Sequence, residues 1–78
     1  MEKENLPYAV VQRLRLVDIL LDQQGFINRG VLMEYFGISM PAASNDLGLY
    51  KEIAPNNMTY DLSNKTYVRT ETFQRVWK

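Results

Sequence analysis

The chain has 78 residues, of which 46% are hydrophobic, and it contains neither cysteine nor histidine. A chain of this length forms one small domain, residues 1–78, and the missing residue types exclude disulfides, thiolate zinc sites and the usual catalytic triads. Nine basic and nine acidic residues give a net charge of zero, which argues against nucleic-acid binding because most of that affinity comes from neutralising phosphates.

The sequence gives no indication of a membrane segment or of enzymatic chemistry. No apolar run approaches the length of a membrane span, and the charged N-terminus lacks a signal-peptide core, so we expect a cytoplasmic protein with no membrane contact. Asp18 and Asp22 stand one helical turn apart on what we predict to be a solvated face, not as a catalytic pair. No nucleotide motif is present, and we expect no cofactor, no metal, no small-molecule ligand and no enzymatic activity.

The first predicted helix runs to about Gln24 and ends at Gly25. Asn5 is a candidate N-cap, and Pro7 suits the first turn because its missing N–H has no partner there. One broad apolar face is predicted to pack on the core and comprises Leu6, Ala9, Val10, Leu14, Leu16, Val17, Leu20 and Leu21.

A short strand and a second helix follow. We predict the strand at residues 26–27 and a helix from Arg29 to Phe36, capped by Asn28. Arg29 at a helix start opposes the local dipole, which favours a functional role as a phosphate contact. The residues that this helix is expected to bury are Val31, Leu32, Tyr35 and Phe36.

Residues 36–47, FGISMPAASNDL, have the pattern of the turn and second helix of a helix-turn-helix. Gly37 suits a corner that needs positive φ, and Ile38 is expected to fill the space between the two helices. Ser39 is a candidate cap for the next helix, whose remaining N–H groups can face a phosphate. Pro41 fits the first turn of that helix.

The third predicted helix runs from Met40 to about Glu52 and has two different faces. Its inner face turns Ala43, Leu47 and Tyr50 toward the core. Its outer face is small and polar, which suits close approach to base edges in a DNA major groove; it carries Pro41, Ser44, Asn45 and Gly48.

Individual residues of that outer face have two possible roles each. Asn45 can grip adenine with two hydrogen bonds, or it is an exposed polar residue with no partner. Met40 either contacts a thymine methyl group or closes the hydrophobic turn. The sequence leaves both choices open.

A β-hairpin is predicted near the C-terminus, with strands at residues 58–61 and 66–69 and a short connecting loop. Tyr60 and Tyr67 are expected to form a cross-strand pair. Lys65 ends the loop, where a phosphate at the groove edge would lie. Three helices followed by a hairpin is the order of a winged helix-turn-helix, an α+β fold that is mainly α, and the hairpin is its wing.

Apolar residues outside the predicted core allow self-association. Val11 and Ile19 fall on the far side of the first helix, as a second packing surface or as isolated exposed residues. Phe73, Val76 and Trp77 share one side of the C-terminal segment and pack either on their own first helix or on a second copy. We expect a homodimer built from these two regions, since one winged helix reads few base pairs.

Five short motifs carry a resemblance to a known family: RLR at residues 13–15, GFINR at 25–29, the turn and helix at 36–47, APNNMTYD at 54–61 and KTY at 65–67. Together they resemble the N-terminal winged helix of WYL-domain transcriptional regulators, in particular the subgroup that controls phage-defence operons. More broadly, the turn and third helix are similar to those of DeoR-type repressors.

The resemblance implies a sequence-specific regulator of double-stranded DNA, acting as a repressor. Its expected DNA contacts are Arg29, Ser39, Met40, Pro41, Ser44, Asn45 and Lys65. Two departures stand out. Many DeoR-type helices carry arginine where this chain has Asn45, and the chain ends at Lys78, where the family continues into dimerisation and ligand-sensing modules. The resemblance therefore implies either an excised DNA-binding domain or a free-standing small protein.

The alternative function is protein interaction. The zero net charge and a third helix without Lys or Arg before Lys51 favour a winged helix that acts as an antirepressor or as an inhibitor of a related regulator. Against it, the folded chain can gather basic residues on one surface; the candidates are Arg13, Arg15, Arg29, Lys65, Arg69, Arg75 and Lys78.

Overall fold

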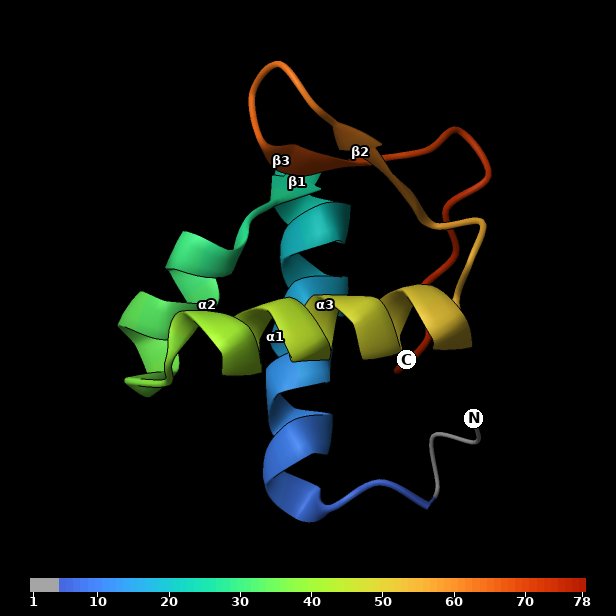
Figure 1. The fold of residues 1–78 in the computed structure, drawn as a ribbon. Helices are drawn as coiled ribbons and strands as arrows, with labels where there is room; N and C mark the ends of the chain where they lie inside the picture. Colours follow the sequence, from blue (N-terminus) through green and yellow to red (C-terminus); the bar gives the residue numbers. More distant parts are fainter. Residues whose placement is uncertain (1–4) are drawn as a thin grey trace.

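The computed structural model describes residues 5–78, which form three helices and a three-stranded sheet (Figure 1). The winged helix order predicted from the sequence, mainly helical with a C-terminal hairpin, is confirmed. No helix in this range is long and apolar enough to cross a membrane. The elements in chain order are α1 (Tyr8–Gln24), β1 (Phe26–Ile27), α2 (Arg29–Phe36), α3 (Met40–Ile53), β2 (Met58–Asp61) and β3 (Thr66–Arg69).

The sheet joins the wing to the helices. Its strand order is β1-β3-β2 and both pairings are antiparallel. The short β1 pairs Ile27 with Tyr67, and β2 pairs Tyr60 with the same residue. Because β1 lies between α1 and α2 in the chain, this pairing fixes the wing against the helical bundle.

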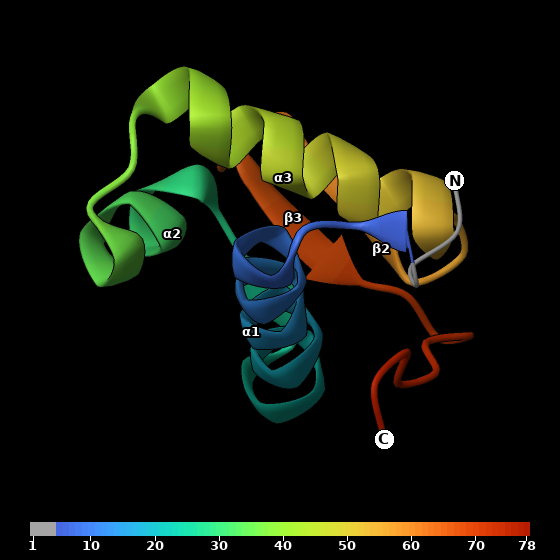
Figure 2. The same cartoon turned by 90° about the horizontal axis from the view of Figure 1, so that it is seen from below.

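The core forms where α3 lies across α1 (Figures 1 and 2). The predicted inner face of α3 is confirmed, since Ala43, Leu47 and Tyr50 are buried. Ala9, which was predicted on the core face of α1, is exposed. The other buried apolar residues are Leu14, Val17, Leu21, Ile27, Leu32 and Met58.

The predicted start of α1 was wrong. The helix begins at Tyr8 with Pro7 in the N-cap position, and no side chain caps it. Asn5 lies ahead of the helix and does not reach it. The predicted end was correct, because Gly25 adopts the left-handed conformation at φ 87° and its N–H donates to the carbonyls of Leu20 and Leu21.

The predicted burial of α2 was half right. Leu32 is buried and Val31 half-buried, but Tyr35 is 69% exposed and Phe36 39% exposed. A helix of eight residues turns one narrow face toward the core. The aromatic residues at its end fall outside that face.

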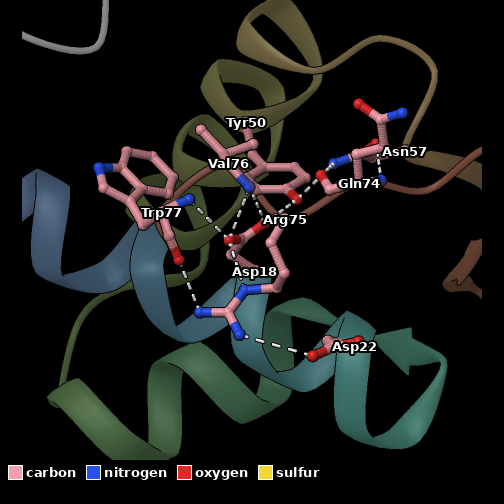
Figure 3. Close-up of polar contacts among 8 residues, drawn as sticks. All are labelled: Asp18, Asp22, Tyr50, Asn57, Gln74, Arg75, Val76 and Trp77. Carbon is pink, nitrogen blue, oxygen red and sulfur yellow. Dashed lines mark hydrogen bonds and ion pairs between the residues drawn. The ribbon is translucent and has the colours of Figure 1, made fainter.

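Asp18 is buried, so its predicted place on a solvated face was wrong. Its carboxylate accepts a hydrogen bond from the Tyr50 hydroxyl at 2.6 Å and another from Arg75 Nε at 2.9 Å (Figure 3). It also accepts from the backbone N–H groups of Val76 and Trp77. A buried carboxylate is tolerated here because charged and polar donors surround it.

Asn57 extends this buried network. Its side-chain N–H₂ donates to the Tyr50 hydroxyl at 3.0 Å and to the carbonyl of Gln74 at 2.7 Å, while its Oδ1 accepts from the N–H of Gln74 (Figure 3). The network thus ties α1, the end of α3 and the C-terminal segment together. Phe73, Val76 and Trp77 pack against the core of their own domain.

Candidate nucleic-acid interface

The turn between α2 and α3 is built as the sequence predicts. Gly37 has φ 63° and its N–H donates to the carbonyl of Met33 at 2.9 Å. Ile38 packs against the core. The hydroxyl of Ser39 accepts from the N–H of Ala42 at 3.3 Å, which confirms its capping role. This geometry sets the angle at which α3 leaves the turn.

The outer face of α3 points away from α1 and lies open to solvent (Figure 2). Met40 is 47% exposed, so it does not close the hydrophobic turn. The four small or polar residues predicted for this face are exposed as well; they are Pro41, Ser44, Asn45 and Gly48.

Asp46 belongs to α3 but not to its open face. Its side chain is 2% exposed, and its Oδ2 accepts from Arg13 Nε of α1 at 2.6 Å. The one acidic residue in the first half of α3 is therefore turned inward and neutralised. The outer face consequently presents no carboxylate between Pro41 and Gly48.

The wing loop is held by a single carboxylate. Asp61 accepts from the backbone N–H groups of Ser63 and Asn64, and from the Asn64 side chain at 2.7 Å. These bonds, the Asn64 side chain first, lower the pKa of Asp61. Thr66 donates its hydroxyl to the Asn64 carbonyl. Lys65 ends this turn with φ 52°, the left-handed region that lysine rarely adopts.

Two tyrosines form a cross-strand contact in the wing. Tyr60 and Tyr67 stand opposite each other in the register of β2 and β3, with ring centroids 4.8 Å apart and planes tilted by 59°. The predicted cross-strand pair is confirmed.

A small hollow forms between α3, the start of α2 and the wing. Its volume is about 100 Å³. The Nη1 group of Arg29 donates to the hydroxyl of Ser44 across it at 3.4 Å. The hollow therefore brings together three residues predicted separately, namely Arg29, Ser44 and Lys65. Its full lining is Arg29, Ser44, Leu47, Tyr60, Lys65 and Tyr67.

The other predicted contacts lie along the first turns of α3, outside this lining. The two tyrosines of the lining were not among the predicted site residues. The predicted pairing of the two tyrosines indicates that they share one face of the hairpin. It does not indicate that this face lies beside the helices, because that depends on the pairing of β1 with β3.

Three of the seven basic residues that could gather on one surface are engaged within the fold. Arg13 is paired with Asp46, and Arg75 with Asp18 and Asp22. Arg69 donates to the carbonyls of Leu21 and Asp22 at the end of α1, a position that suits a cation. These three arginines stabilise the fold, and Arg29 and Lys65 are the cations that meet at one hollow.

Comparison with known proteins identifies the family. The winged helix-turn-helix domain of BrxR transcriptional regulators matches residues 9–77. Relatives named DNA-binding transcriptional repressor CapW are 43% identical over 67 residues in Stenotrophomonas maltophilia and 46% over 66 residues in Escherichia coli. These matches cover 86% and 85% of this chain but 22% of each relative. A Pseudomonas aeruginosa repressor of the same name is 41% identical over 66 residues. The chain belongs to the BrxR transcriptional regulator winged helix-turn-helix family.

Proposed function

We propose that this chain binds double-stranded DNA in a sequence-specific manner and serves transcriptional repression in the cytoplasm, without catalytic chemistry of its own. The observation that carries the proposal is the outer face of α3 from Pro41 to Gly48, where the exposed residues are small or polar and none carries a carboxylate. Such a helix can lie deep in a major groove. The relatives named DNA-binding transcriptional repressors support the same function. Repression would follow from occupying DNA that polymerase needs.

Each residue of the surface has an assigned role in this proposal. Asn45 hydrogen-bonds the edge of an adenine, and Met40 contacts a thymine methyl group beside it. Ser44 and Pro41 keep the helix surface low enough for close approach. Ser39 caps α3 and leaves the other N–H groups of its first turn to face a phosphate.

A gel-shift assay with DNA from upstream of the chain's own gene, at low and moderate salt, tests this function. Asn45→Ala should lose about 1–3 kcal/mol of discrimination between the bound sequence and a scrambled one, because a base contact disappears. Asn56→Ala, an exposed asparagine beyond the end of α3, is the matched control and should discriminate as the wild type does. Equal discrimination by Asn45→Ala and wild type would contradict the assigned role.

A second copy of the chain is the partner that we propose. Phe73, Val76 and Trp77 pack on their own core, so the surface left for pairing is the outer side of α1. There, Tyr8 is 79% exposed and Ile19 39% exposed. Saturation of a palindromic site at two chains per duplex in the same assay would support the pair, and saturation at one chain would contradict it.

Protein binding is the second candidate function. The zero net charge favours it, and so do the exposed aromatic residues Tyr35 and Phe36 at the end of α2. A chain that shifts no duplex but forms a complex with a related regulator would establish this function instead.

A further inference from the structure

We propose that the hollow between α2, α3 and the wing seats one phosphate of the DNA backbone, held by Arg29 and Lys65 together. The inference rests on the proposed DNA binding and adds to it a specific site. Arg29 comes from the first turn of α2 and Lys65 from the wing, yet both line the same space of about 100 Å³. The two cations therefore share one anion rather than contacting two.

The charge of the lining fits a phosphate. It contains two cations, three residues that carry hydroxyl groups (Ser44, Tyr60 and Tyr67) and no carboxylate. The nearest acidic residue on the wing, Asp61, is committed to the loop by the donors of Ser63 and Asn64. An anion in the hollow would thus meet donors without a competing negative charge.

Arg29 is presented as a phosphate ligand. Its Nη1 contact with the Ser44 hydroxyl is long, at 3.4 Å, and exposed, so the guanidinium keeps further N–H donors that can pair with two phosphate oxygens. Its charge does not stabilise α2, because a cation at a helix N-terminus opposes the dipole. A bound phosphate would turn this unfavourable position into a favourable one.

Lys65 is held at the hollow against its backbone preference. Its φ of 52° is unfavourable for a residue with a side chain, and the bonds of Asp61 to the loop keep the turn in place. A glycine would adopt this conformation more readily. A residue kept in a strained conformation is consistent with a binding role for its side chain.

The tyrosine pair forms one side of the hollow. The rings of Tyr60 and Tyr67 line it together with Leu47. Aromatic and aliphatic walls displace water around a bound anion, and a charge pair is stronger where water is excluded.

Neutral-backbone scanning of the bound duplex tests the shared phosphate. Methylphosphonates are placed one at a time along the site found by gel shift, and affinity is measured for wild type, Arg29→Ala and Lys65→Ala. We expect one position where neutralisation weakens wild-type binding about tenfold but weakens each variant less than about threefold. If Arg29→Ala and Lys65→Ala each lose sensitivity at a different backbone position, the two cations bind different phosphates. That result would contradict the shared phosphate site but not the proposed DNA binding.

The salt dependence of DNA binding gives an independent count of the phosphates that Arg29 and Lys65 contact. One lost phosphate contact lowers the slope of log K against log salt by about 0.9. The double variant Arg29→Ala/Lys65→Ala should therefore lose about 0.9, and a loss of about 1.8 would mean two separate phosphates. Lys78→Ala, at an exposed cation of the C-terminal segment, is the control and should leave the slope unchanged.

A glycine variant separates charge from turn geometry. Lys65→Gly removes the cation but suits the left-handed backbone, so it should melt at a higher temperature than Lys65→Ala and bind DNA equally weakly. Full wild-type affinity in Lys65→Gly would overturn the role of the lysine charge. A chain that binds no duplex at any salt concentration would overturn the proposed function and this site with it.

Discussion

At the scale of single residues, Tyr50 shows how burial and hydrogen bonding act on one hydroxyl. Burial first, and then the hydrogen bond to the Asp18 carboxylate, raise the pKa of Tyr50. The hydroxyl donates to Asp18 and accepts from Asn57. It is therefore the link between α3 and the buried network, and it must stay protonated to hold that place.

Alkaline pH should weaken this link. Because the pKa of Tyr50 is higher in the folded than in the unfolded chain, its contribution to stability is complete below pH ~10 and is lost as the pH rises above that value. At neutral pH Tyr50→Phe should cost about 1–3 kcal/mol, since two buried groups lose a partner. In urea unfolding, the difference in free energy of unfolding between wild type and Tyr50→Phe should become smaller as the pH rises above ~10. Tyr35→Phe, at an exposed tyrosine, is the control, and its difference in stability from wild type should be small at every pH. A stability difference for Tyr50→Phe that does not change with pH would contradict the role of the Tyr50 hydroxyl.

At the scale of elements, the C-terminal segment has no regular secondary structure and is held by side chains. Asp18 accepts from Arg75 Nε and from two backbone N–H groups of the segment, while Asn57 bonds both the N–H and the carbonyl of Gln74. The segment closes one side of the core with apolar residues. Its position depends on these polar contacts as much as on packing.

Removing the charge of Asp18 should release the segment. Asp18→Asn should lower the free energy of unfolding by about 3 kcal/mol, because Arg75 and the backbone donors lose a buried anionic acceptor. Asp22→Asn is the matched control, since Asp22 meets the same arginine at 3.5 Å and is 37% exposed, and it should change stability by about 0.5 kcal/mol or less. Urea titration measures the free energy of unfolding of both variants. In Asp18→Asn, the backbone amides of Val76 and Trp77 should also exchange hydrogen faster than in the wild type. Equal effects of the two variants would contradict this account.

Local signals predicted most of the elements. The strands at residues 58–61 and 66–69 and the bounds of α2 are as predicted, because each rests on neighbouring residues such as a cap or a turn. Asp18 was misplaced because its partners Arg75 and Val76 are 57 and 58 positions away, which no periodicity can reveal. The meeting of Arg29 with Lys65 was unpredictable for the same reason, although each was named as a phosphate contact.

At the scale of the whole molecule, the zero net charge and the proposed DNA binding are compatible. Asp46 and Asp18 are buried and paired with arginines that hold the helices and the C-terminal segment. Their charges cancel inside the fold and do not act at the outer face of α3. What matters for a DNA partner is the surface that remains, with the cations Arg29 and Lys65 beside that face.

The most direct test of this account is a map of the surface that DNA covers. A ¹⁵N-labelled chain titrated with the duplex found by gel shift should show backbone amide shifts concentrated at residues 39–48 of α3 and at the wing loop, residues 62–66. Smaller shifts are expected on the outer side of α1, where we propose that a second copy of the chain pairs. Shifts confined to α1 and the end of α2, or no shifts at saturating duplex, would contradict a DNA-binding surface formed by α3 and the wing.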